Sequence, residues 1–131
     1  MVLDACALIA FLNDEPGADV VAAALQAVPV VEMAAINLLE IAYDAVRRSG
    51  QPDSARDVLE TVRHLSISIR RDIDDDVLEM AAHFKARFRI SLADSVALAV
   101  AVVCDAPLVT CDHHEFDAIE AAGITRFLWI R

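Results

Sequence analysis

The sequence predicts an α/β domain built around a mainly parallel sheet. Short runs of β-branched and apolar residues alternate along the chain with longer segments of helical periodicity. Hydrophobic residues make up 57% of the chain and charged residues 24%, which is typical of a globular protein and not of a disordered one. With 131 residues and no internal repeat, low-complexity tract or Pro/Gly-rich linker, residues 1–131 are expected to form a single domain.

Five short segments have the composition of strands. The first, VL, ends at Asp4, and SISIR alternates polar and apolar residues as a half-buried strand does. The others are short apolar runs that lie between helical segments. The predicted strands are residues 2–3, 29–33, 66–70, 106–111 and 125–130.

Seven segments show helical periodicity. The helix at 36–50 carries Ile36, Leu39, Tyr43 and Val46 on one apolar stripe, and Gly50 is its stop signal. Acidic residues crowd the first turn of the helix at 72–88, where the helix dipole favours them. The predicted helices are residues 5–13, 18–28, 36–50, 53–65, 72–88, 91–105 and 114–123.

The charge balance argues mildly against a nucleic-acid ligand. There are 21 acidic and 11 basic residues, so the net charge is −10, the wrong sign for an ordinary nucleic-acid binder. A local basic surface can nevertheless coexist with a negative total charge. Lys85, Arg87 and Arg89 form such a cluster in sequence.

The cysteines and the N-terminus indicate a cytoplasmic protein. Cys6, Cys104 and Cys111 form neither a CxxC pair nor an even disulfide set, which suits a reducing compartment. No secretory signal is visible, because Asp4 stands where a positive segment would be expected. The apolar run after Asp94 is about ten residues long, about half of what crossing a bilayer requires.

Four acidic residues stand beside or inside core-forming sequence. Asp4 lies at the carboxyl end of the first predicted strand, and Asp112 follows the strand LVT by two residues. In open α/β sheets the ligand crevice lies outside such strand ends. Glu40 borders the apolar stripe of its helix, and Asp94 lies three residues after Ser91, the candidate N-cap. If the four converge, their repulsion requires a cation, and Mg²⁺ or Mn²⁺ prefers such an all-oxygen cluster.

Each of these acids also has a simpler explanation. Asp4 and Asp112 could cap or begin the helices that follow them. Asp94 could interact with the dipole at a helix N-terminus. Glu40 could be partly exposed and paired with the arginines at 47–48. The weight of the metal-site hypothesis therefore comes from all four acids together.

Four stretches that contain these acids resemble PIN domains, in particular the VapC toxins of type II toxin–antitoxin pairs. Individually the motifs are loose, but they occur in the family's order and cover essentially the whole chain. The stretches are MVLDACALIAFLNDEPG, INLLEIAYDAV, FKARFRISLADSVALAVA and PLVTCDHHEF.

The resemblance implies an α/β/α sandwich whose acids converge at one end of the sheet. It also implies Mg²⁺-dependent endonucleolytic cleavage of RNA (Mn²⁺ being a possible substitute), a VapB-like antitoxin partner, and a homodimer that forms a heterotetramer or larger assembly with the antitoxin. Asp4, Glu40, Asp94 and Asp112 carry over as catalytic metal ligands, and Thr110 matches a recurrent hydroxyl position.

Several positions add detail to this expectation. Glu115 and Asp117 lie near Asp112 and could assist or replace it, with Asp117 the favoured substitute if the loop geometry differs from the family's. Cys6 departs from the family, in which that position is often Ser or Thr, and a thiol is a weaker hydrogen-bonding group. The adjacent histidines at 113–114 do not have the spacing of a structural zinc site.

The expected mechanism uses a metal-activated water and no side-chain nucleophile. Asp4 and Asp94 are expected to be the innermost ligands, and Lys85, Arg87 and Arg89 to hold the RNA backbone. The alternative is a PIN-like RNA-binding or interaction module with reduced or no nuclease activity. Receiver domains and haloacid-type phosphatases are disfavoured, because Cys6 stands where the phosphatase needs an Asp and the only Lys lies within a helix.

Overall fold

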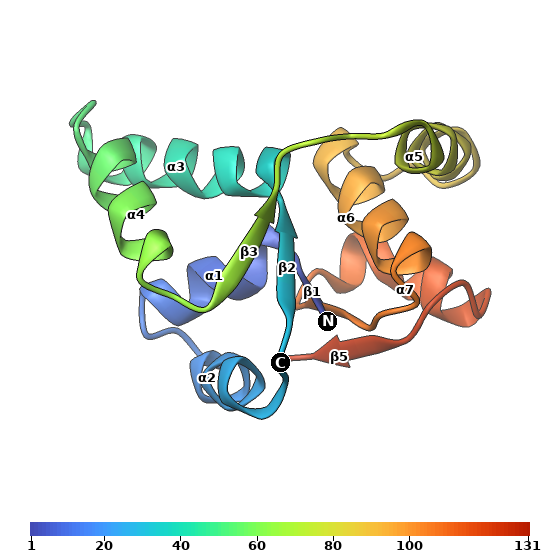
Figure 1. Cartoon of the computed structure of the whole chain (residues 1–131), viewed down its shortest axis with the longest axis horizontal. Helices are drawn as coiled ribbons and strands as arrows, with labels where there is room; N and C mark the ends of the chain where they lie inside the picture. Colours follow the sequence, from blue (N-terminus) through green and yellow to red (C-terminus); the bar gives the residue numbers. More distant parts are fainter.

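The computed structural model describes all 131 residues, Met1–Arg131, and contains one five-stranded sheet. Every neighbouring pair of strands is parallel, in the order β3-β2-β1-β4-β5. The predicted parallel α/β fold is therefore confirmed (Figure 1). The strands are β1 Val2–Leu3, β2 Val31–Ala34, β3 Ile67–Arg70, β4 Leu108–Thr110 and β5 Phe127–Trp129.

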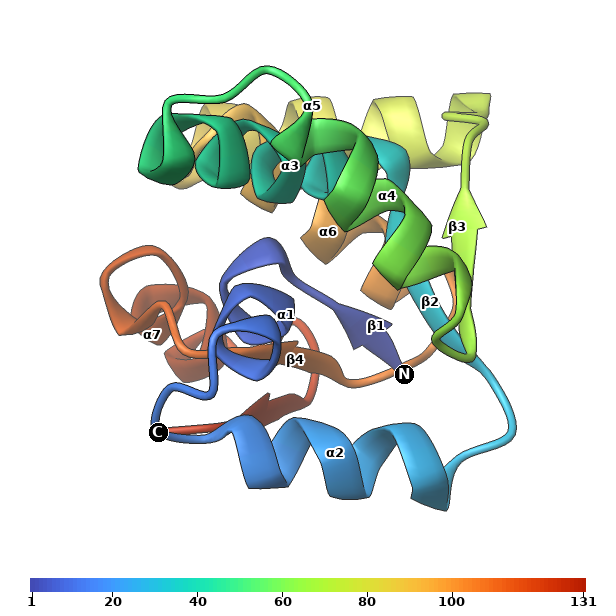
Figure 2. The same ribbon diagram turned by 90° about the vertical axis from the view of Figure 1, so that its left-hand side faces the viewer.

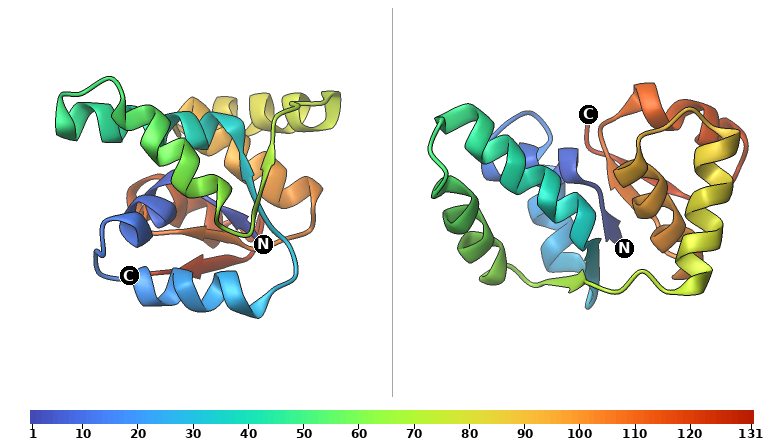
Figure 3. Two further views of the ribbon diagram at one scale, coloured as in Figure 1. Left: turned by 60° about the vertical axis from the view of Figure 1, so that its left-hand side comes forward. Right: turned by 90° about the horizontal axis from the view of Figure 1, so that it is seen from above.

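Seven helices cover the two faces of the sheet, and the views from other directions show the same layers (Figure 3). The first four pack on one face and the last three on the other. None of them combines the length and the apolar composition that crossing a bilayer requires. The helices are α1 Ala5–Leu12, α2 Ala18–Ala27, α3 Ala35–Ser49, α4 Ser54–Arg63, α5 Asp75–Arg87, α6 Leu92–Val103 and α7 His113–Ala121.

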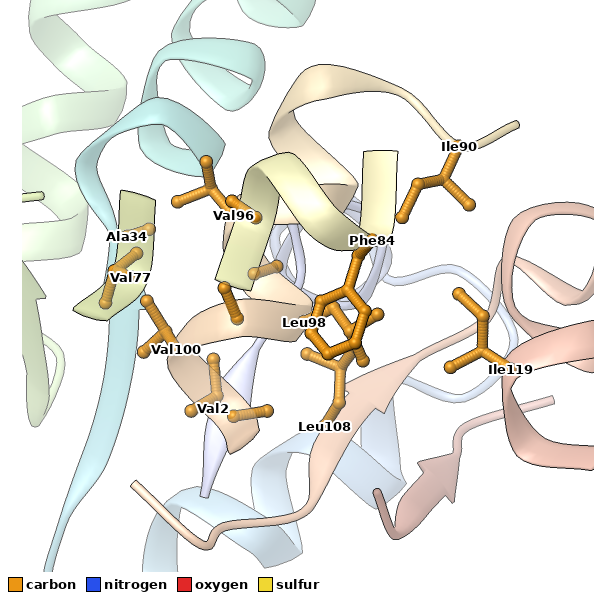
Figure 4. Packing of buried hydrophobic residues seen from close by; sticks show 14 of the residues in the cluster. Val2, Ala34, Val77, Phe84, Ile90, Val96, Leu98, Val100, Leu108 and Ile119 are labelled. Carbon is orange, nitrogen blue, oxygen red and sulfur yellow. The ribbon is translucent and has the colours of Figure 1, made fainter. Parts of the chain in front are cut away.

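Two apolar cores lie on opposite faces of the sheet, because successive strand side chains point to opposite sides. Val2 of β1 belongs to the core under α5, α6 and α7, whereas Leu3 belongs to the core under α1, α2, α3 and α4. Phe84, Leu98 and Leu108 meet within the first of these cores (Figure 4). Burial on both faces explains why the central strands are almost wholly apolar.

Helix boundaries follow local capping groups. The helix predicted at 72–88 begins later, at Asp75, because the Asp74 carboxylate accepts a hydrogen bond from the Val77 N–H and caps it. The predicted cap at Ser91 is confirmed, since its Oγ accepts from the Asp94 N–H at 3.1 Å. Before α2, Gly17 has φ of 92°, and a Cβ there would lie 2.5 Å from the Ile130 carbonyl oxygen, so only glycine fits.

The middle of the apolar stripe predicted for α3 is exposed, although Ile36 packs against a core. The helix buries Leu38, Ile41 and Ala42, whereas Leu39 and Tyr43 are 65% and 64% exposed. The stripe does not mark the inward face of α3, because that face also contains two buried polar residues, Asn37 and Asp44, which hide its periodicity. Leu39 and Tyr43 line a groove of about 440 Å³ together with Ile36, Glu40, Ser91, Leu92 and Ala93.

The N-terminus of α2 and the end of the chain are held together. Arg131 donates to the Pro16 carbonyl oxygen at 2.8 Å and pairs with Glu15 at 3.3 Å. Figure 2 shows α2 running past the chain terminus, below β4 and α1. These contacts join the end of the chain to the segment that leads into α2.

Candidate active site

The candidate site lies where the chain leaves β1 and β4. These strands are neighbours, with Leu3 opposite Val109. Asp4 and Thr110 are the next residues along each strand, so they lie side by side at the carboxyl ends of the two strands. From β1 the chain continues to β2 on one side, while β4 lies on the other side. Such a switch in strand order opens a crevice at the carboxyl ends of the strands, where α/β proteins bind ligands.

A cavity of about 350 Å³ occupies this crevice and is lined by carboxylates. All four acids predicted from the sequence share it, although they come from β1, α3, α6 and the start of α7. No Lys or Arg side chain lines it. The acidic lining residues are Asp4, Glu40, Asp94, Asp112 and Glu115.

Asp4 is the most deeply buried of these acids, with 2% exposure. Its Oδ1 accepts from the Ala5 N–H at 2.6 Å and from Asn37 Nδ2 at 3.2 Å. Its Oδ2 accepts from Thr110 Oγ1 at 2.9 Å and from Cys6 Sγ at 3.2 Å. The four donors hold the carboxylate in one orientation, and the Ala5 bond makes Asp4 the N-cap of α1 as well.

Thr110 connects the two acids that follow strands. Its buried hydroxyl donates to Asp4 and accepts from the Asp112 N–H at 3.1 Å. Asp112 in turn caps α7, since its Oδ1 accepts from the Glu115 N–H at 3.1 Å. Asp4 and Asp112 therefore each cap a helix and also line the cavity.

Asn37 connects Glu40 to Asp4 and was not found from the sequence. It is fully buried in α3, and its Nδ2 lies 3.2 Å from Asp4 Oδ1, 3.5 Å from Glu40 Oε2 and 3.4 Å from the Ala93 carbonyl oxygen. Its Oδ1 has no hydrogen-bond partner. The available signal was a polar residue one turn before Glu40 on the same helix face.

Glu115, and not Asp117, is the additional acid in the cavity. Glu115 Oε2 accepts from the Ser91 N–H at 3.1 Å and so connects α7 to the start of α6. Asp117 is exposed and pairs with His113 Nδ1 at 2.7 Å. Glu115 lies one turn after the cap and faces the cavity, whereas Asp117, the substitute favoured for a different loop geometry, lies on the exposed side of α7.

The acids of the cavity lie close together, and no Lys or Arg side chain lines the space between them. Burial raises the pKa of Asp4 well above its usual value, and Cys6 and Asp94 add to the effect. Burial and then the charges of Asp94 and Asp4 raise the pKa of Glu40 to about 7. The pKa of Asp94 is also raised, first by burial. Arg47 and Arg48, the alternative partners of Glu40, instead pair with Asp44, each at 2.6 Å.

The donor chemistry fits a hard divalent cation, although no three side chains form a ready coordination group. Mg²⁺ and Mn²⁺ take carboxylate oxygens and retain water ligands, and carboxylates are the acidic groups that line this cavity. A divalent charge would also lower the raised pKa values of Asp4, Glu40 and Asp94, because it favours their ionised forms.

A basic surface adjoins the acidic cavity. Arg87 and Arg89 line a neighbouring pocket with His114 and Glu115, so Glu115 borders both spaces. Lys85 has a different place, because its Nζ donates to the Ile90 carbonyl oxygen at 2.6 Å and holds the segment that leads into Ser91. Of the three predicted RNA-binding residues, two therefore line a pocket next to the cavity.

The raised pKa of Glu40 predicts that the metal-free protein loses stability as pH increases. A carboxyl with a higher pKa in the folded than in the unfolded state retains its proton longer when folded, so stability falls as pH rises from about 4.5 towards about 7. Melting temperatures in EDTA between these pH values should decrease, and Glu40→Gln should flatten the decrease. Glu60→Gln, an exposed change on α4, is the control. Equal slopes in the parent and Glu40→Gln would contradict the assignment.

Comparisons with known proteins identify the family and the fold. Comparison with curated protein sequences finds no match. Three solved structures cover most of the chain at 21% identity or less, which shows a shared fold. They are a toxin–antitoxin complex from Klebsiella pneumoniae (21% identity, 99% of this chain and 97% of that chain, TM-score 0.70), DNA-bound VapBC from Salmonella typhimurium (18%, 99% and 97%, 0.72) and Mycobacterium tuberculosis VapC20, a sarcin–ricin loop cleaving toxin (18%, 93% and 93%, 0.67).

The family model of the PIN domain matches residues 1–122. This range includes every element from β1 to α7 and all five carboxylates of the cavity. The chain belongs to the PIN-domain family.

Proposed function

We propose that this chain is the toxin of a type II toxin–antitoxin system and cleaves RNA as an Mg²⁺-dependent endoribonuclease, with Mn²⁺ as a substitute. The observation that carries the proposal is the cavity at the ends of β1 and β4, which has five carboxylates and no lysine or arginine. Buried acids with raised pKa values at the crevice of an α/β sheet are a signature of a functional site.

The residues of the cavity have different roles in the proposed reaction. Asp4, oriented by its four donors, and Asp94 are the innermost ligands, and Glu40 and Asp112 complete the set. When bound, the cation supplies Lewis acidity that activates water and stabilises charge on the scissile phosphate. Thr110 holds Asp4 and the Asp112 backbone at a constant spacing.

The substrate path follows from the position of the basic surface. Arg87 and Arg89 lie on the side of the cavity that Glu115 borders. There their guanidinium groups can bind phosphates next to the scissile one without entering the acidic cavity. Because the protein has a net charge of −10, RNA binding depends on this local surface and on the cation.

An antitoxin partner and a homodimer belong to the same proposal. Solved structures of similar fold contain VapBC and other toxin–antitoxin complexes. In this chain, the apolar groove with Leu39, Tyr43 and Leu92 adjoins Glu40, so a partner segment seated there would also cover the entrance to the cavity. Light scattering of the chain alone and with an antitoxin measures both assemblies. The cytoplasm, with its reducing conditions, is the proposed compartment.

The test of the proposed activity is cleavage of a structured RNA under controlled metal conditions. We expect cleavage with Mg²⁺ or Mn²⁺, none in EDTA, and recovery when Mg²⁺ is restored. Calorimetric titration with Mn²⁺ distinguishes the alternative, a PIN-like interaction module without nuclease activity, which should bind Mn²⁺ poorly. Undiminished cleavage in EDTA would contradict the mechanism.

Removing Arg87 and Arg89 is expected to weaken RNA binding more than the chemical step. In the double variant Arg87→Ala/Arg89→Ala we expect KM to rise about tenfold, because two phosphate contacts are lost. The slope of log binding constant against log salt concentration should fall by about 1.4, at roughly 0.7 per contact with a single strand. Arg56→Ala/Arg63→Ala on α4 makes the same charge change away from the site. An equal effect of both pairs would indicate net charge and not a binding surface.

A further inference from the structure

Two cysteines that are 105 positions apart in sequence meet beside the carboxylate cavity. Cys6 Sγ accepts a hydrogen bond from the Cys111 backbone N–H at 3.1 Å, so the Cys6 sulfur lies against the backbone of Cys111. Cys6 lies in the first turn of α1, and Cys111 follows β4 directly. The two cysteines come together because β1 and β4 are paired, and each cysteine lies shortly after the carboxyl end of one of these strands.

Both thiols are within reach of a small oxidant. Each side chain is partly exposed, and Cys6 is one of the residues that line the cavity of about 350 Å³. The third cysteine, Cys104, is exposed at the end of α6 and contacts Arg70 and Glu32 instead. The chain therefore contains one thiol pair and one isolated thiol that serves as an internal comparison.

The pair is directly connected to the acids of the site. Cys6 donates to Asp4 Oδ2 at 3.2 Å and lies 3.2 Å from Thr110 Oγ1. Cys111 immediately precedes Asp112. A bond between the two sulfurs would take the Cys6 S–H away from Asp4 and leave Thr110 as the sole donor to Oδ2, because a disulfide sulfur carries no proton.

We propose that Cys6 and Cys111 are a reversible redox site: oxidation joins them in an intramolecular disulfide at the rim of the carboxylate cavity and frees an acceptor position on Asp4 for the divalent cation. The second part rests on the proposed metal-dependent function, and the first part does not. The disulfide links the start of α1 to the segment that carries Asp112. This cross-link restrains Asp4 and Asp112 relative to each other, because each acid lies within two residues of one of the cysteines.

The chemistry requires hydrogen peroxide as the oxidant. One thiol attacks a peroxide oxygen, the O–O bond breaks, and a sulfenic acid and one water form. The second thiol attacks that sulfur, the S–O bond breaks, the S–S bond forms and a second water leaves. The two sulfurs supply the two electrons, both thiol protons end in water, and a dithiol reductant reverses the result.

Peptide mapping of the full-length, metal-free protein tests the first part. After treatment with stoichiometric hydrogen peroxide in EDTA, we expect the intact mass to fall by two hydrogen atoms and a non-reducing digest to contain a peptide that links Cys6 to Cys111. Cys104→Ser should form the same link, and Cys111→Ser should not. Dithiothreitol should restore the starting mass. A link through Cys104, or independent oxidation of Cys6 and Cys111 without a link, would overturn the proposal.

Calorimetry with Mn²⁺ tests the second part. We expect the oxidised protein to bind Mn²⁺ about threefold more tightly or better than the reduced protein, because one competing donor to Asp4 has been removed. Cys6→Ala removes the same donor without forming a link and should reproduce the gain. Equal affinity in the oxidised and reduced proteins would overturn the effect on Asp4. If the reduced protein binds no Mn²⁺ at all, the proposed function itself fails, whereas the disulfide is still decided by the peptide map.

Discussion

Asp94→Asn is expected to abolish Mg²⁺-dependent RNA cleavage and, in the absence of metal, to make the protein more stable near neutral pH. Asp94 is 8% exposed, and burial followed by the charges of Glu115 and Asp112 raises its pKa. Asn has nearly the same shape but no charge to bury. Losing one cation ligand is expected to lower the cleavage rate by about 100-fold or more, since several kcal/mol of charge stabilisation depend on the ion.

The opposite sign of the two effects follows from the raised pKa. An acid whose pKa is higher in the folded state destabilises the fold once it ionises, so its cost is present at neutral pH and absent in acid. Initial cleavage rates at saturating Mg²⁺ and melting temperatures in EDTA measure the two effects. Asp105→Asn, at the exposed opposite end of α6, is the matched control. If Asp94→Asn cleaved RNA as fast as the parent, Asp94 would have no part in the reaction.

Phe116→Ala is expected to lower the free energy of unfolding by about 3–5 kcal/mol, the range for truncating a buried aromatic residue. Phe116 is fully buried in α7, and its ring centroid lies 5.6 Å from that of Phe127 in β5. The residue before it, Glu115, lines the cavity, and the cap of the same helix is Asp112. The space left by the missing Phe116 ring should therefore also make the positions of Glu115 and Asp112 less fixed, and the affinity for Mn²⁺ should fall.

Urea unfolding and Mn²⁺ calorimetry measure these two effects of Phe116→Ala. Leu39→Ala also truncates a large apolar residue, but Leu39 is 65% exposed, so its effect on stability should stay within about 0.5 kcal/mol. A loss in Phe116→Ala no larger than in Leu39→Ala would show that α7 is not anchored by this side chain.

Most of the elements and most of the site were accessible to sequence reasoning because their signals are local. Helical spacing, strand composition and caps such as Ser91 depend on residues within a few positions of one another. Asp4 and Asp112 could be placed at strand ends for the same reason. Their position at the ends of parallel strands then predicted that they would share a crevice.

The errors of the sequence analysis occur where burial of polar groups changes the pattern. In α3, the exposed Leu39 and Tyr43 formed the more obvious apolar stripe, whereas the inward face includes Asn37 and Asp44. Both polar residues are buried with hydrogen-bonding or charged partners, to which hydrophobic periodicity is insensitive. Asn37 was missed for this reason, although it contacts two acids of the site.

The local sequence determined the order of helices and strands, the apolar character of α6 and the presence of four acids at element ends. The tertiary structure decided that β1 and β4 are neighbours, that Glu115 and not Asp117 enters the cavity, and that Cys6 meets Cys111. The physical reason is distance along the chain. Contacts between residues about a hundred positions apart depend on strand order and on the rotation of each helix about its axis, and neither is encoded in the few residues around a motif.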